Sequence, residues 1–164
     1  MASDPYLKPY RTSMLDRLLD AREAGSMQTL LQLEQSILRD VQDLLNTCRP
    51  PQGQFASLPD ANKSVANYGI MDFAHLELMS PAGRNEVLDH IKEVIKTFEP
   101  RLTNVEVAER NPADVEKMAK KDYHKGAVYL QIKATLIGNP GPDVSFETIL
   151  ELASGAHTVK KDLS

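Results

Sequence analysis

The proline at position 100 separates a part of this chain with helical periodicity from a part with strand periodicity. Before it, apolar residues recur three and four positions apart, as on one face of a helix; these are Val87, Leu88, Ile91, Val94, Ile95 and Phe98. After it, Val105 and Val107 alternate with Glu106 and Ala108, as in a half-buried strand. Proline disfavours helix for the residue before it and cannot donate the next helical hydrogen bond. We therefore expect a helix to end and a strand to begin at this joint.

The joint carries two opposite charges, Glu99 and Arg101, on either side of Pro100. Residues two apart in an extended segment lean the same way. The pair has three possible uses, namely a solvent-exposed corner, a catalytic group or an anchor for a protein partner. The stiff proline favours the anchor, because a preorganised arginine makes bidentate contacts with carboxylates.

A second helix is predicted upstream, and Pro50 and Pro51 end it. Its apolar face has the same helical spacing and consists of Leu30, Leu33, Ile37, Val41, Leu44, Leu45 and Cys48. Cys48 is the only cysteine of the chain. Its place on this face predicts a buried structural residue rather than a nucleophile.

Alternating patterns downstream of the joint predict a small sheet. Residues 128–136 form the clearest strand, and residues 144–152 a further strand with a register imperfection near Thr148. Residues 156–160 are expected to form a short last strand. Helices come first and strands follow, so the fold class is α+β: two main helices packed on an antiparallel sheet of three to four strands.

The 164 residues suit one compact domain. We expect residues 1–25 to be a partly ordered N-terminal extension and residues 26–164 to form a single domain. The extension is either a fraying terminus with one docked turn or a segment that orders against a partner.

Charge and composition weigh against several classes of function. A net charge of −4 argues against general affinity for nucleic acid. The lysines between residues 117 and 125 favour a solvated connection, with a module that binds an anion or nucleic acid as the alternative. The four histidines lack the paired spacing of a zinc site, so no metal or cofactor is expected. No apolar run approaches the roughly 20 residues that span a bilayer.

A glycosidase using Glu99 as its proton donor is the main alternative, with Asp40, Asp43 or Asp72 as the second carboxylate. Arg101 weighs against it, because a neighbouring arginine favours the charged form of a carboxylate. The chain also has no tryptophan and only 5% aromatic residues for a groove that stacks on sugars.

Several motifs occur in the order seen in one family. Residues 36–47 (SILRDVQDLLNT), residues 64–69 (SVANYG) and residues 98–102 (FEPRL) resemble elements of TssE, the baseplate subunit of bacterial type VI secretion systems. The last motif is shared with the lysozyme-like baseplate wedge proteins of contractile-tailed phages. Leu38 and Cys48 stand where arginine is usual in the family.

The resemblance implies a structural subunit that assembles into the baseplate wedge and docks or nucleates the contractile sheath, on the cytoplasmic side of the envelope. The implied partners are other wedge subunits and sheath proteins, with no cofactor, nucleic acid, membrane insertion or small-molecule substrate. The implied wedge contacts are Glu99, Pro100, Arg101, Arg39, Asp40, Asn67 and Tyr68. The implied sheath contacts in the C-terminal strands are Val144, Phe146, Thr158 and Val159.

Overall fold

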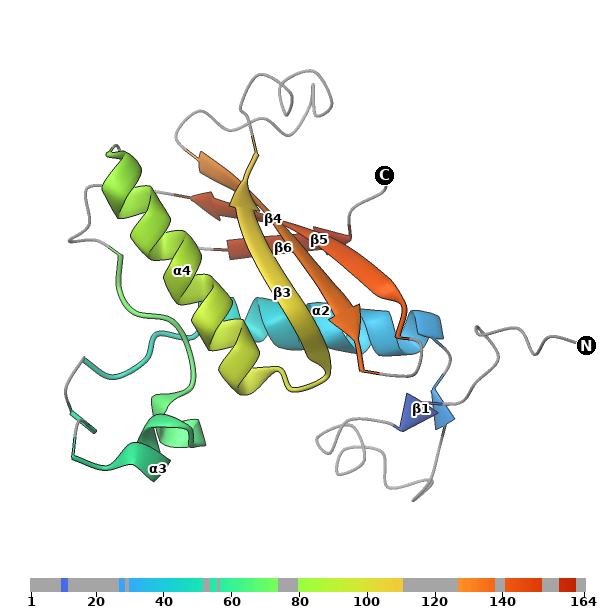
Figure 1. The fold of residues 1–164 in the computed structure, drawn as a ribbon, viewed down its shortest axis with the longest axis horizontal. Coiled ribbons are helices and arrows are strands. Elements are labelled where there is room, and N and C mark those ends of the chain that lie inside the picture. Colours follow the sequence, from blue (N-terminus) through green and yellow to red (C-terminus); the bar gives the residue numbers. More distant parts are fainter. Residues whose placement is uncertain are drawn as a thin grey trace, which may run out of the picture.

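The computed structural model describes residues 10–11, 27–28, 30–51, 54–55, 57–73, 80–110, 127–137, 141–151 and 157–161. Within these residues the two main helices are α2 (Leu30–Asn46) and α4 (Pro81–Phe98). Four strands follow, β3 (Leu102–Glu109), β4 (Ala127–Leu136), β5 (Asp143–Glu151) and β6 (His157–Lys161). They form one antiparallel sheet in the order β3-β4-β5-β6 (Figure 1). The predicted α+β class is confirmed, with four strands in the sheet.

Four shorter elements complete the described chain. β1 (Tyr10–Arg11) pairs with β2 (Met27–Gln28), so the predicted extension contributes a strand that meets the residues before α2. Between α2 and α4 lie α3 (Pro59–Asn62) and the 3-10 turn η2 (Val65–Asn67). The lysines at residues 117–125 lie outside the described residues.

The proline joint divides the chain as predicted. Helix α4 begins where the Ser80 hydroxyl accepts a hydrogen bond from the Gly83 amide, with Pro81 at its first position. It ends at Phe98, and Glu99 leaves the helical conformation. The chain turns at Arg101 and enters β3 at Leu102.

The prediction that Cys48 is buried is wrong, because this cysteine is exposed. Helix α2 ends at Asn46, two residues earlier, so the helical spacing no longer sets the direction of the Cys48 side chain. Cys48 instead lies in an isolated parallel bridge with Ile70.

The predicted register imperfection near Thr148 is also wrong. Strand β5 pairs continuously with β4 and alternates without interruption, with Val144, Phe146, Thr148 and Leu150 facing inward. Thr148 is fully buried although it is polar, and its hydroxyl lies 3.5 Å from Nδ1 of His157. A polar residue at an inward position interrupts the apolar pattern of the sequence without interrupting the strand.

The irregularity of the sheet lies in β3 instead. Asn104 has a φ of 51°, and the pairing with β4 shifts between Thr103 and Glu106. Such a bulge adds a residue to one strand. It allows Leu102 and Val105, three positions apart, both to reach the core.

A single apolar core lies between the helices and the sheet. Helix α2 packs against β6 and α4 against β3, so the two helices cover one face of the sheet (Figure 1). The inward residues of β4 and β5 meet the apolar faces of both helices in one cluster. This packing places the joint after α4 directly beside α2.

Candidate functional site

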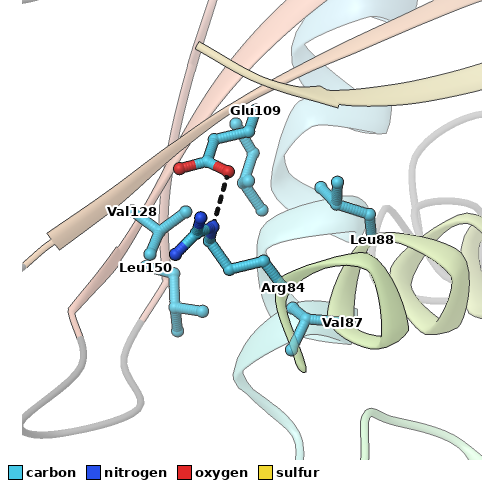
Figure 2. Close-up of a pocket in the computed structure, with 7 residues that line it drawn as sticks. Arg84, Val87, Leu88, Glu109, Val128 and Leu150 are labelled. Carbon is cyan, nitrogen blue, oxygen red and sulfur yellow. Dashed lines mark ion pairs between the residues drawn. The ribbon is translucent and has the colours of Figure 1, made fainter. Parts of the chain in front are cut away.

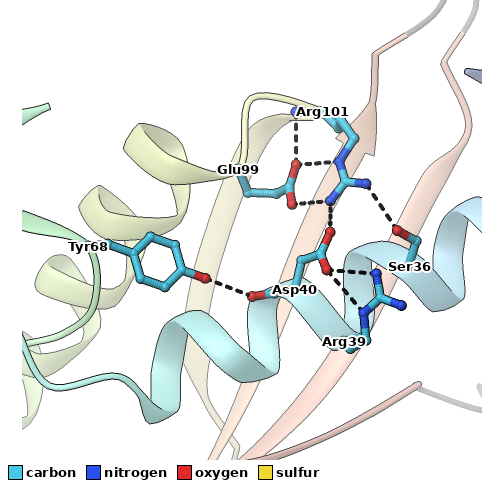
Figure 3. Close-up of polar contacts among 6 residues, drawn as sticks. All are labelled: Ser36, Arg39, Asp40, Tyr68, Glu99 and Arg101. Atoms are coloured by element: carbon cyan, nitrogen blue, oxygen red, sulfur yellow. Dashed lines mark hydrogen bonds and ion pairs between the residues drawn. The ribbon is translucent and has the colours of Figure 1, made fainter. Parts of the chain in front are cut away.

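Glu99 and Arg101 form a closed ion pair within the joint (Figure 3). Nε of Arg101 donates to Oε1 of Glu99 at 2.7 Å, and Nη2 donates to Oε2 at 2.5 Å. The backbone amide of Arg101 also donates to Oε1, at 3.2 Å. Glu99 is only 4% exposed. The pair is therefore no solvent-exposed corner, and both oxygens of the carboxylate are occupied.

Arg101 extends this pair to helix α2. Its Nη2 also donates to Oδ2 of Asp40 at 2.6 Å, and its Nη1 lies 3.3 Å from the hydroxyl of Ser36. Asp40 in turn accepts from Arg39 at 3.2 Å through its other oxygen. The four charged residues Arg39, Asp40, Glu99 and Arg101, called the joint cluster below, tie α2 to the turn between α4 and β3 (Figure 3).

The joint cluster contains two cations and two anions, of which Arg39 is exposed and the other three are partly or fully buried. Burial opposes the charge of Arg101, but hydrogen bonds and attraction from Glu99, and then from Asp40, raise its pKa above the ordinary value. A bidentate pair satisfies the donors of a guanidinium and fixes its plane. Arg101 therefore stays charged at any physiological pH, and the cluster acts as a rigid brace.

Tyr68 joins the loop after α3 to the same region. Its hydroxyl lies 3.5 Å from the backbone oxygen of Asp40, and its ring meets Phe98 edge-on at 5.5 Å. Burial, followed by the negative charges of Asp43, Asp40 and Glu99, raises the pKa of Tyr68. The phenol therefore remains a neutral donor.

The end of the same loop is locked to the end of α2 by backbone contacts. Gly69 has a φ of 111°, and a Cβ added there would lie 2.2 Å from the backbone oxygen of Thr47. The Ile70 amide donates to that oxygen at 2.8 Å, and the Arg49 amide donates to the Ile70 oxygen at 2.9 Å. Only glycine fits this close approach.

The structure brings together most of the predicted wedge contacts. Arg39, Asp40, Tyr68, Glu99 and Arg101 meet at one place, although they come from three separate segments. Asn67 is used within its own turn, where its side-chain amide donates to the Asn62 oxygen at 3.1 Å. Pro100 is exposed beside the cluster.

The predicted sheath contacts lie elsewhere, at β5 and β6. Val144, Phe146 and Val159 are 7%, 1% and 4% exposed, so their side chains belong to the core. Strand β5 is interior, because it pairs with β4 on one side and β6 on the other. Thr158 is exposed on β6, the strand at that edge of the sheet.

Asn46 is a residue whose part in this arrangement the sequence did not reveal. Its side-chain oxygen accepts from the His157 amide at 2.9 Å, and its side-chain nitrogen donates to the His157 oxygen at 2.8 Å. The Asn46 amide thus pairs with the start of β6 as a neighbouring strand would. Ser36 was also missed, although its place four residues before Asp40 on α2 puts both on one helix face.

A small cavity lies between α4 and the sheet (Figure 2). Apolar side chains of α4, β4 and β5 line it, and the ion pair between Arg84 and Glu109, at 3.1 Å, closes one side. Its volume is about 10 Å³, which is room for roughly one water molecule. It cannot hold a sugar.

The described residues contain no group of three or more histidine, cysteine or acidic side chains placed to hold a metal ion. None of their helices is long and apolar enough to cross a membrane.

The fold and the site define a small α+β protein whose clustered charges brace its own elements. The chain belongs to the family of the baseplate wedge protein gp25, whose profile matches residues 31–141. It is therefore a structural protein of the baseplate class. A chain in a solved structure described as "The baseplate complex from the type VI secretion system" is similar, with 18% identity and a TM-score of 0.44 over 73% of this chain and 94% of that one. None of the curated proteins matches this chain.

Proposed function

We propose that this chain is a subunit of a type VI secretion baseplate, which assembles into the wedge and docks or nucleates the contractile sheath at the cytoplasmic side of the envelope. Membership of the baseplate wedge family supports the structural role. The motifs at residues 36–47, 64–69 and 98–102 support the type VI assignment by their resemblance to TssE. The joint cluster carries the proposal, because its charged groups bind one another and fix the shape of the protein.

The joint cluster disfavours the glycosidase alternative. A general acid must reach the substrate oxygen and release a proton to it. Glu99 is buried, and Arg101 occupies both of its oxygens. The small cavity beside α4 offers no groove for a sugar.

The wedge contact is assigned to the exposed rim of the joint cluster. The Arg39 side chain is 51% exposed, whereas that of Glu99 is 5% exposed. Arg39 and Pro100 are therefore the residues that a partner contacts. Glu99, Arg101 and Asp40 hold the joint in place. A half-exposed arginine held by its pair with Asp40 suits an interface anchor.

The sheath contact is assigned to β6, through addition of a strand from a sheath protein. Thr158 is exposed there. The Asn46 amide already pairs with His157, and Val159 is buried. A sheath strand therefore pairs with β6 beyond Val159, or it displaces the Asn46 side chain from His157.

The test is reconstitution of the full chain with the other purified wedge subunits. Arg39→Glu should weaken binding at least tenfold with an unchanged circular dichroism spectrum. Lys92→Glu, the same charge reversal on α4 outside the joint cluster, should bind as the wild type does. Equal binding by wild type and Arg39→Glu would contradict the assignment of the rim.

A turbidity assay on purified cell walls tests the enzymatic alternative directly. We expect the wild-type protein to leave turbidity unchanged. Hydrolysis that Glu99→Gln abolished would overturn the structural proposal.

A further inference from the structure

The segment between the two main helices is poor in charge. Of the twenty residues 51–70, only Asp60 and Lys63 are charged, whereas 26% of the whole chain is charged. Depletion of charged residues distinguishes the centre of a protein interface from the rest of a surface. Within it, α3 and η2 lie side by side and project away from the sheet (Figure 1).

Hydrogen bonds hold the projecting segment in one conformation. The Ser64 hydroxyl accepts from the Ala66 amide at 3.2 Å and donates to the Ala61 oxygen at 2.8 Å. The side-chain amide of Asn62 donates to the Phe55 oxygen at 3.3 Å. Asn67, Tyr68 and Gly69 also make the contacts described above. The polar side chains and the glycine of this turn therefore have structural partners within the protein.

The side chain of Val65 in this turn extends into solvent. It is 89% exposed at the start of η2, and Leu58, which precedes α3, is 56% exposed. Valine has one side-chain torsion and is stiff at that torsion. A valine on a hydrogen-bonded turn therefore loses little conformational entropy when it docks.

We propose that Val65 is an anchor that enters an apolar socket on another protein subunit of the wedge. The partner's socket carries few charges, because this surface offers only Asp60 and Lys63 to match. The proposal rests on the proposed function, since it names a second contact for the same assembly. This contact is separate from the charged rim at Arg39.

A membrane surface fits the same patch less well. Insertion of a loop into a lipid headgroup region favours several basic residues and exposed aromatic rings around the apolar tip. Lys63 is the only basic residue between positions 51 and 70, and the ring of Tyr68 packs on Phe98. The surface therefore suits a protein socket better than an anionic bilayer.

The experiment measures binding of the full chain to the other purified wedge subunits for three matched variants. Val65→Asp should weaken binding at least tenfold, and Val65→Ile should retain it. Leu31→Asp is the control, because Leu31 is 64% exposed on α2 and receives the same change. All three should keep the wild-type melting temperature, since the two altered side chains are exposed.

The outcomes separate the anchor from the proposed function. If the wild type binds the wedge subunits and Val65→Asp binds equally well, the anchor is refuted and the function stands. If the wild type binds none of them, the proposed function itself fails. Light scattering and flotation with anionic vesicles complete the test, and Val65-dependent dimers or Val65-dependent vesicle binding without a wedge defect would overturn the choice of partner.

Discussion

Arg101 binds both carboxylate oxygens of Glu99, the residue two positions earlier, across the proline that separates them. The two charged residues of the joint between α4 and β3 thus bind each other as well as contacting α2. The guanidinium then reaches Asp40 and Ser36 with its remaining donors. A motif that reads as two free charges is the brace of a corner.

Arg101→Ala should destabilise the protein, because it leaves Glu99 buried without its partner. Removal of one member of a buried pair costs about 3 kcal/mol or more. Asp40→Ala removes a partner whose side chain is 24% exposed, and we expect a smaller loss of about 1 kcal/mol. Urea unfolding monitored by circular dichroism measures both values.

A conservative variant separates charge from geometry at the same position. Arg101→Lys keeps the positive charge but cannot form the two parallel bonds to Glu99. Its stability should lie between those of the wild type and Arg101→Ala. Wild-type stability in Arg101→Lys would show that the bidentate geometry is unimportant.

Gly69→Ala should lower stability by about 2 kcal/mol or more, because it adds both a positive-φ penalty and a clash with the Thr47 oxygen. For a domain of this size that corresponds to a fall in melting temperature of roughly 4–8 °C. Differential scanning calorimetry provides the measurement. An unchanged melting temperature would mean that the loop after η2 is not held against α2.

Stability should fall as the pH drops below 6.5. Burial lowers the pKa of His157 to about 4, and burial together with the nearby charge of Arg49 lowers the pKa of His90 to about 4. Between pH 6.5 and about 4 these two histidines are protonated in the unfolded chain but neutral in the folded chain. The histidines therefore stabilise the fold fully above pH 6.5 and progressively less as the pH falls towards 4.

Unfolding in urea at a series of pH values checks this dependence. In His90, Nε2 accepts from the Met71 amide at 3.1 Å, and protonation would break that bond. His157→Leu should flatten the loss of stability between pH 6.5 and 4.5, because the new side chain cannot titrate. An identical slope in wild type and His157→Leu would show that His157 is not the titrating group.

Cys48 should react with a thiol reagent in the native protein as fast as a small model thiol does, within about tenfold. Its exposure past the end of α2 is the reason. Ellman's reagent, added with and without denaturant, gives the comparison. If the thiol reacted only after unfolding, Cys48 would be buried, as the helical spacing predicted.

The elements with strong periodicity were predictable because their patterns extend over several turns or pairs. Helix α4 shows this best, since Ser80 and Pro81 mark its start and Pro100 marks its end. The errors came at single positions where another constraint overrides the pattern. Cys48 continues a helical spacing after the helix has ended, and Thr148 is polar at an inward position.

The candidate site was only half predictable. The sequence places Glu99 and Arg101 on one joint, but their burial depends on α2, where Asp40 lies 61 positions before Arg101. That Arg101 would reach Asp40 and Ser36 follows from the packing of the helices and the sheet, which local patterns do not encode. The clamp between Asn46 and His157 has the same origin, because its partners are 111 positions apart.

Co-purification of the tagged chain from its native bacterium, with quantitative mass spectrometry of the bound proteins, tests the central claim most directly. We expect the other baseplate wedge subunits in a fixed proportion to this chain, and a much lower yield of them with Arg39→Glu than with Lys92→Glu. Recovery of the chain without any wedge subunit, under conditions that preserve the assembled baseplate, would contradict the claim.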